Sequence, residues 1–174
     1  MYSDILILVM LANNPMHGYE IKKRVEIVLG GSVTLNNKVL YPTLKRFEEM
    51  EAVRREVVRQ EGKPDRHLYS LTDHGRELIQ MLLQDASPDV LRNDSEFLVR
   101  VSLFNLVEPE VRLEILSTRA EIVRKSIAHL QEMKMLAHER NADTFAEEVI
   151  TFNEQQELHE LTWIEALMQK ARQV

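Results

Sequence analysis

The sequence predicts a mostly α-helical protein in two parts. Three observations carry this prediction. An amphipathic helix lies within residues 33–51, two strand-like runs at 53–59 and 67–71 flank a turn-rich interval, and two long periodic segments fill the C-terminal half. Three helices, a hairpin and a further helix are the order of a winged helix-turn-helix with a two-stranded wing. Long C-terminal dimerisation helices follow it.

The first two helices are predicted at residues 2–12 and 17–29. The first is apolar throughout, which indicates a buried helix, and Pro15 opposes its continuation. The second ends at Gly30-Gly31, a pair suited to a helix C-terminus. Its apolar face is expected to carry Tyr19, Ile21, Val25, Val28 and Leu29.

The central helix is expected to separate a core face from a basic face. Asn36 or Asn37 is its candidate N-cap, and Pro42 is expected within the first turns, where a missing N–H costs little. Apolar side chains recur at three- and four-residue steps, at Val39, Leu40, Leu44, Phe47 and Met50. Polar side chains are expected to point away from the core, at Lys38, Thr43, Lys45 and Arg46. A short basic helix of this kind fits the major groove of DNA.

The hairpin is predicted to place Lys63 near its tip, with Arg59 and Arg66 close by. Lys63 is a candidate phosphate contact, and His67 is a second one. After the hairpin, Thr72 or Asp73 is expected to cap a helix that runs through Leu83.

A polar interval at residues 85–89 predicts two domains, 1–85 for DNA binding and 86–174 for helical dimerisation. Helices are expected at 96–107, from Pro109 through 137, and at 143–171. Two helices of about 30 residues, about 45 Å each, are too long to be buried against so small a first domain. Their apolar stripes therefore predict a homodimer.

Composition excludes several classes of protein. The 174 residues are 44% hydrophobic and include no cysteine, so neither a disulfide framework nor a thiolate zinc site can form. The longest apolar run of the first helix is too short to span a bilayer, and we read no signal peptide, so a cytoplasmic location is expected. No catalytic, phosphate-binding or metal-binding motif stands out, so we expect neither an enzyme nor a cofactor nor a metal.

The net charge of −6 argues at first against a nucleic-acid partner. However, residues 1–85 hold 12 basic and 12 acidic side chains, so the acidic excess lies in the second half. Residues 54–66 hold five basic side chains against three acidic ones. A neutral domain with a local basic strip can still bind phosphates.

Three segments resemble one family of proteins. Residues 38–49 (KVLYPTLKRFEE) resemble the recognition-helix signature LYPxLxRLE of PadR-type winged-helix transcriptional regulators. Residues 16–21 (MHGYEI) and 66–75 (RHLYSLTDHG) resemble two further motifs of that family, in the same order. Lys38 and Glu51 stand where the family usually has glycine.

The resemblance implies a homodimeric repressor that binds an inverted-repeat operator in double-stranded DNA, with recognition helices about 34 Å apart. It also implies that a small, often aromatic, ligand releases some relatives from DNA. The residues that we expect to bind DNA are Asn37, Lys38, Tyr41, Thr43, Lys45, Arg46, Lys63, Arg66 and His67.

Two other functions fit the same residues. The winged helix could be a scaffold for protein interaction, with the acidic helices binding a different protein. Alternatively, the chain could be a ligand sensor with weak or no DNA binding, and Phe97 and Trp163 are then its candidate effector contacts. For Trp163, packing in the core or at a dimer interface is the favoured interpretation.

Overall fold

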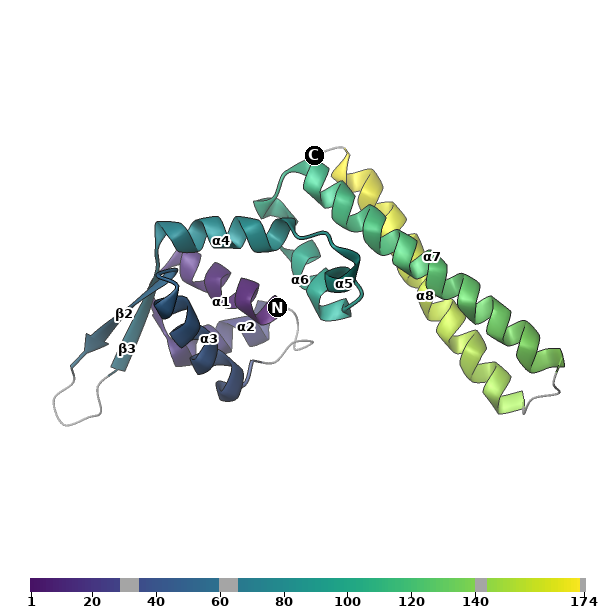
Figure 1. Ribbon diagram of the computed structural model, residues 1–174, viewed down its shortest axis with the longest axis horizontal. Coiled ribbons are helices and arrows are strands. Elements are labelled where there is room, and N and C mark those ends of the chain that lie inside the picture. Colours follow the sequence, from purple (N-terminus) through teal and green to yellow (C-terminus); the bar gives the residue numbers. More distant parts are fainter. Residues whose placement is uncertain (29–34, 60–65, 140–143, 173–174) are drawn as a thin grey trace. The chain divides into compact units, whose positions relative to one another are not determined.

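The structure is a computed structural model that describes residues 1–28, 35–59, 66–139 and 144–172 (Figure 1). It divides into two compact units. Unit 1 comprises residues 1–85 and 98–107, and unit 2 comprises residues 86–97 and 108–174. One change of unit thus falls between residues 85 and 86, and residues 98–107 group with the first unit. The assignment of functions to two domains stays a prediction.

Unit 1 contains the predicted order of helices and strands, and the winged helix-turn-helix is confirmed. In chain order its main elements are α1 Tyr2–Asn13, β1 Met16–His17, α2 Gly18–Val28, α3 Asn37–Glu49, β2 Val53–Val58, β3 Arg66–Leu71 and α4 Asp73–Gln84. Residues 60–65, which include the predicted wing tip Lys63, lie outside the described residues.

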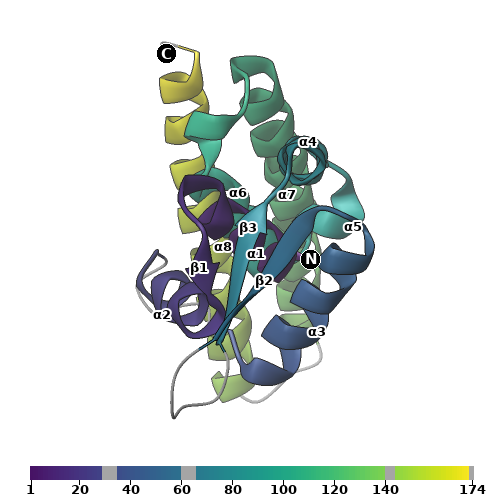
Figure 2. The ribbon, with the colours of Figure 1, turned by 90° about the vertical axis from the view of Figure 1, so that its left-hand side faces the viewer.

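The sheet has one strand more than the sequence predicted. Its order is β1-β3-β2, with β3 in the middle (Figure 2). Strands β2 and β3 pair antiparallel from Val53 opposite Leu71 to Val58 opposite Arg66. Strand β1 pairs antiparallel with β3, with Met16 opposite Tyr69. Because β1 has only two residues, its sequence shows no alternation, and its pairing arises from tertiary contact.

Helix α1 is the centre of the unit 1 core, as its apolar sequence predicted. Ile5, Leu6, Ile7 and Leu8 are fully buried, and α1 packs against α2, α3 and α4. Burying large aliphatic side chains is worth about 1.5–3 kcal/mol each, so this run contributes strongly to the stability of the unit. Asp4 is also buried, and its partner is described below.

Two residues that were predicted to lie on an apolar helix face, Tyr19 and Met50, are exposed. On α2, Ile21 and Val25 are buried, but Tyr19 is 71% exposed. At 100° per residue, Tyr19 points to nearly the opposite side of the helix from Ile21. Met50 is 43% exposed because α3 ends at Glu49, which makes Met50 the C-cap rather than a member of the apolar face. The side chains of Val28 and Leu29 lie outside the described residues.

Helix α3 begins at an N-cap that the sequence named as one of two candidates. The Asn36 side-chain Oδ1 accepts a hydrogen bond of 3.0 Å from the backbone N–H of Val39. Pro42 lies in the second turn of α3, within the first turns as expected, but past the first four residues, where a missing N–H would cost little. An N–H at position 42 would have donated to the carbonyl of Lys38, so proline removes one helical hydrogen bond here.

The buried stripe of α3 includes Thr43, which corrects the prediction that Thr43 points away from the core. Thr43 is 6% exposed, and its buried neighbours are Leu40, Leu44 and Phe47. Positions 40, 43, 44 and 47 follow the i, i+3, i+4, i+7 spacing of a single helix face, so Thr43 shares that face whatever its polarity. Thr43 therefore has little exposed surface with which to contact DNA.

The C-terminus of α3 has the geometry of a Schellman motif around Glu51. The backbone N–H of Ala52 donates to the carbonyl of Phe47 at 2.9 Å, and that of Glu51 donates to Glu48 at 3.1 Å. Glu51 has a φ of 56°, the left-handed conformation that favours glycine. The glycine that the family usually has at this position would adopt this left-handed conformation easily. In this chain glutamate adopts the same conformation.

The same helix end is tied to the start of α4. The Thr72 hydroxyl donates to the carbonyl of Glu51 at 2.7 Å and accepts from the N–H of Gly75 at 3.1 Å, as the predicted N-cap of α4. A Cβ at position 75 would lie 2.2 Å from the backbone oxygen of Ala52. Glycine at 75 is therefore what allows α4 to start against the end of α3.

Unit 2 is built on an antiparallel pair of long helices (Figure 1). Its elements are α5 Pro88–Leu91, the start of α6 Asp94–Ser102, α7 Pro109–Glu139 and α8 Thr144–Ala171, while the end of α6 and a 3-10 helix at Phe104–Leu106 belong to unit 1. Hydrogen bonds and ion pairs join Arg119 to Glu160, Ser126 to Glu157 and Lys134 to Glu154. Residue numbers fall along α8 as they rise along α7, which defines the antiparallel pairing.

A buried arginine holds the start of α6 and the end of α5 on this helix pair. Arg119 is 6% exposed, and its guanidinium donates to Glu160 at 2.6 and 2.9 Å and to Asp94 at 2.7 Å. It also donates to the carbonyl of Leu91 at 2.8 Å and lies 5.2 Å from the centre of the Phe97 ring. Burial alone would lower the pKa of Arg119, but the hydrogen bonds to Glu160 and Asp94 outweigh it and raise the pKa.

Candidate nucleic-acid interface

The face of α3 opposite the core is exposed and basic. Asn37, Lys38, Tyr41 and Lys45 are exposed and recur at three- and four-residue steps along the helix. They stand opposite the buried stripe of Leu40, Leu44 and Phe47, so the face is held by the core beneath it. Of the residues predicted to contact DNA from this helix, these four lie on this face, and Arg46 is exposed beside it.

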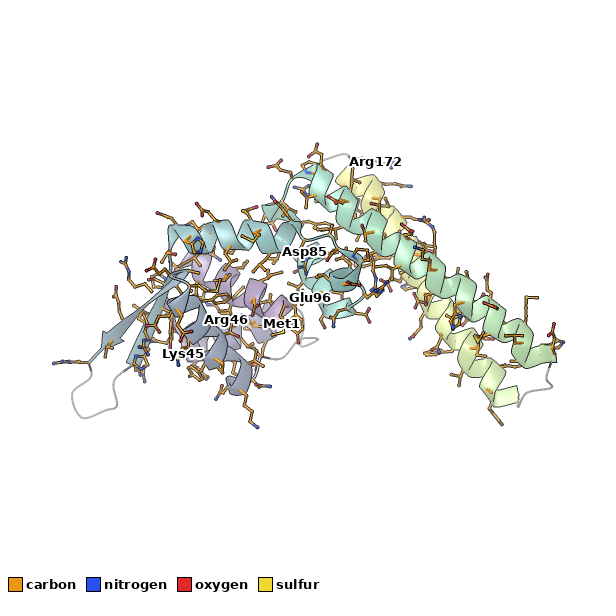
Figure 3. All side chains as sticks on the ribbon, viewed as in Figure 1. Met1, Lys45, Arg46, Asp85, Glu96 and Arg172 are labelled. Atoms are coloured by element: carbon orange, nitrogen blue, oxygen red, sulfur yellow. The ribbon has the colours of Figure 1, made fainter. Side chains whose placement is uncertain are left out.

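Lys45 is an available cation of the face. Its side chain is 75% exposed, and its ammonium lies 3.7 Å from the carboxylate of Glu49, which is itself exposed. Exposed pairs one helical turn apart contribute only about 0.3–0.5 kcal/mol and weaken with salt. Lys45 can therefore leave Glu49 for a phosphate at little cost. Figure 3 labels the Lys45 and Arg46 side chains on α3.

Arg46 is placed differently from Lys45. Its guanidinium pairs with the carboxylate of Asp4 on α1 at 2.8 Å and lies 5.2 Å from the centre of the Phe47 ring. The Asp4 side chain is 11% exposed, whereas that of Arg46 is 48% exposed. Arg46 is exposed, as predicted, but its charged end pairs with the first helix, which the sequence did not indicate.

A cavity of about 360 Å³ lies beside α3 and the first half of β3. It brings together three predicted contact residues, Tyr41, Arg66 and His67, with residues of β1 and α2. The lining residues are His17, Gly18, Tyr19, Glu20, Tyr41, Arg66, His67 and Tyr69. A Cβ at position 18 would lie 3.0 Å from a ring carbon of Tyr41, so glycine there lets the Tyr41 ring pack against the start of α2.

Hydrogen bonds fix the walls of this cavity. The Nδ1 of His17 lies 2.8 Å from the carbonyl oxygen of His67, which requires the N–H to be on Nδ1. The backbone N–H of His17 donates to Glu20 at 2.9 Å. Burial raises the pKa of Tyr69, with Arg55 opposing the shift and Glu48 and Tyr41 adding to it, so Tyr69 stays neutral. The cavity thus has a rigid floor and an exposed basic rim at Arg66.

A second cavity, of about 410 Å³, adds residues of α2 to the candidate interface. It is lined by Asn37 and Tyr41 of α3 together with Tyr19, Lys22, Lys23 and Glu26 of α2. Tyr19 and Lys23 are one helical turn apart, and this spacing was the signal in the sequence that they share a side of α2. The two lysines extend the basic surface from α3 onto α2.

The two candidate effector contacts pack against each other in unit 2. Phe97 is fully buried, and its ring meets that of Trp163 edge to face, with centroids 6.0 Å apart and planes at 83°. Trp163 is 37% exposed. Phe97 therefore has no exposed surface for a ligand, and the packing interpretation of Trp163 is the one that these contacts support.

Unit 1 is a winged helix-turn-helix domain whose third helix presents a basic, exposed face. Residues 7–81 match the family model described as the transcriptional regulator PadR-like family. This part of the chain is therefore a PadR-like domain, and the resemblance inferred from its three motifs is confirmed.

A relative of known sequence agrees with this assignment. A probable transcriptional regulator of Mycobacterium tuberculosis, Rv1176c, is 35% identical over 83 residues. These residues cover 47% of this chain and 44% of the relative, so the chain matches less than half of that protein's length.

Two solved structures are similar to the chain. A PadR family transcription regulator from Clostridium difficile R20291 is 30% identical over 49% of this chain and 86% of its own, with a TM-score of 0.42. Bacillus subtilis PadR in complex with operator DNA is 17% identical over 97% and 96% of the two chains, with a TM-score of 0.45.

Proposed function

We propose that the chain is a DNA-binding transcriptional regulator that inserts α3 into the major groove. The observation that carries this proposal is the exposed face of Asn37, Lys38, Tyr41 and Lys45 on a helix whose other side is anchored in the core. Lys22 and Lys23 extend this face along α2, where they suit the adjacent phosphate backbone. Arg46 is not part of the proposed face, because it pairs with Asp4.

The hairpin completes the proposed interface. Arg66 and His67 lie at the start of β3, on the rim of the first cavity, and both are exposed. With the predicted contact of Lys63, they would follow the backbone beside the groove. Repression at an inverted repeat and release by a small aromatic ligand remain proposals that rest on the family resemblance.

Replacing Lys45 by alanine is expected to weaken DNA binding without unfolding the protein. A duplex selected from a random pool would serve as the operator, and affinity would be measured over a range of salt. If Lys45 contacts a phosphate, the salt slope should fall by about one per protomer for every duplex. If it contacts a base edge, the loss should be about 1–3 kcal/mol and confined to the selected site.

Lys125→Ala is the matched control, because Lys125 on α7 also pairs with a glutamate one turn away, Glu121, at 2.7 Å. It should leave DNA affinity unchanged. An absence of binding to any duplex at low salt would contradict the proposed function and favour a protein-interaction module. Equal losses for Lys45→Ala and Lys125→Ala would show that only total charge matters.

We also propose that unit 2 forms a homodimer through α8. Each long helix covers one side of the other, yet Phe145, Val149 and Phe152 remain 81%, 60% and 57% exposed. Their i, i+4, i+7 spacing places them on one face of α8. A second copy of the chain is the economical cover for such a stripe. Helices α7 and α8 are long enough to span a bilayer, but no described helix is both long and apolar enough for this.

Phe152→Glu is expected to convert a dimer at micromolar concentration into monomers, because it would place a carboxylate inside the proposed interface. Gln169→Glu adds the same carboxylate to an exposed position of α8 that lies beyond the stripe and off its face, and it should leave the dimer intact. Sedimentation equilibrium would measure both variants. A wild-type protein that is monomeric under these conditions would refute the proposed dimer.

A further inference from the structure

We propose that Asp4 is a specificity-determining residue of the DNA-binding face, because it holds Arg46 away from DNA. The inference rests on the proposed function of α3. Through Asp4, helix α1 would influence how α3 recognises DNA, although α1 itself has little exposed surface. Asp4 would set the number of cations that α3 offers to phosphates.

Two contacts fix the Arg46 guanidinium where the structure places it. On one side it forms an ion pair with Oδ1 of Asp4 at 2.8 Å, and because that buried oxygen accepts no hydrogen bond, the attraction is one of charge. On the other it lies 5.2 Å from the centre of the Phe47 ring, whose side chain is buried in the core. A planar guanidinium can make both contacts together, which a lysine ammonium could not reproduce.

Breaking this ion pair would leave Asp4 in an unfavourable state. The Asp4 side chain is 11% exposed, so little water could replace the lost guanidinium around Oδ1. The second oxygen, Oδ2, lies 3.6 Å from the amino nitrogen of Met1, a longer contact with an exposed group. A phosphate that captured Arg46 would thus have to offset an uncompensated carboxylate in the protein.

Lys45 provides the contrast on the same helix. Its partner Glu49 is 65% exposed, so water solvates Glu49 when Lys45 leaves. Adjacent positions therefore carry one cation that is free to bind DNA and one that is committed to α1. Phosphate contacts carry no sequence information, so withholding Arg46 weakens binding to all sequences alike. Contacts to base edges then supply a larger share of the binding free energy.

The test compares Asp4→Asn, Arg46→Gln and their combination in the full-length protein. Binding to a labelled duplex of mixed sequence is followed by fluorescence anisotropy as salt is raised. Asp4→Asn should release Arg46, steepen the salt slope by about one per protomer and tighten binding about 3- to 10-fold at low salt. Arg46→Gln alone should change affinity less than about twofold, and the double variant should match it.

Lys45→Gln is the reference for a cation of this helix that does contact DNA, and it should reduce the salt slope. The inference is overturned if Arg46→Gln reduces the slope as much as Lys45→Gln does, or if Asp4→Asn leaves it unchanged. Should Asp4→Asn fail to fold by circular dichroism, the comparison of Arg46→Gln with Lys45→Gln decides alone.

The outcomes also separate this inference from the proposed function. Loss of binding in Lys45→Gln with an equal loss in Arg46→Gln refutes the role of Asp4 and leaves DNA binding standing. A wild-type chain and an Asp4→Asn variant that both fail to bind any duplex refute both proposals together.

Discussion

Arg119→Ala is expected to lower the free energy of unfolding by about 3–5 kcal/mol. Removal of the guanidinium leaves Glu160 and Asp94 without their partner and leaves the carbonyl of Leu91 without its donor. The truncation also removes the cation above the Phe97 ring. The loss combines a vacated space with several unpaired acceptors, which is why it should exceed that of an ordinary surface pair.

Arg124→Ala supplies the control on the same helix pair. Arg124 pairs with Glu165 at 2.9 Å, but both side chains are more than half exposed, so its loss should cost about 0–1 kcal/mol. Urea unfolding with a probe of helix content would measure both variants. Similar costs for Arg119 and Arg124 would mean that the buried network adds little beyond a single ion pair.

The sequence predicted most elements because their boundaries are set locally. Asn36 and Thr72 each accept a hydrogen bond from the first turn of the helix that follows, and these caps precede apolar periodic runs. The Schellman geometry at Glu51 could not be deduced from the residue itself, since glutamate seldom takes a positive φ.

The candidate site was predicted only in part, because its residues interact over long sequence distances. The pairing of Asp4 with Arg46 joins two helices, and a charge pattern alone presents Arg46 as a solvated residue. The burial of Thr43 and Arg119 had a signal that we did not use. Each lies three or four residues from apolar neighbours on both sides, so helical spacing alone puts it on the buried face.

Phe47→Ala is expected to cost about 3–5 kcal/mol of unfolding free energy. The ring is 2% exposed and lies in the stripe that fixes α3 on the core, so its removal leaves a cavity beneath the proposed DNA-binding face. The ring also supports the Arg46 guanidinium, at 5.2 Å from its centre. Phe47→Leu is the control that keeps the site apolar and should cost less.

The neighbouring positions should then separate stability from binding. Lys45→Ala should change stability by less than about 0.5 kcal/mol, because its ion-pair partner Glu49 is exposed. Arg46→Ala should cost about 1–3 kcal/mol, because it leaves the buried Asp4 without its cation. Stability would be measured by urea unfolding and affinity with the selected duplex. If Lys45→Ala proved as destabilising as Phe47→Ala, or Phe47→Ala were neutral, the division of α3 into a core face and a binding face would be wrong.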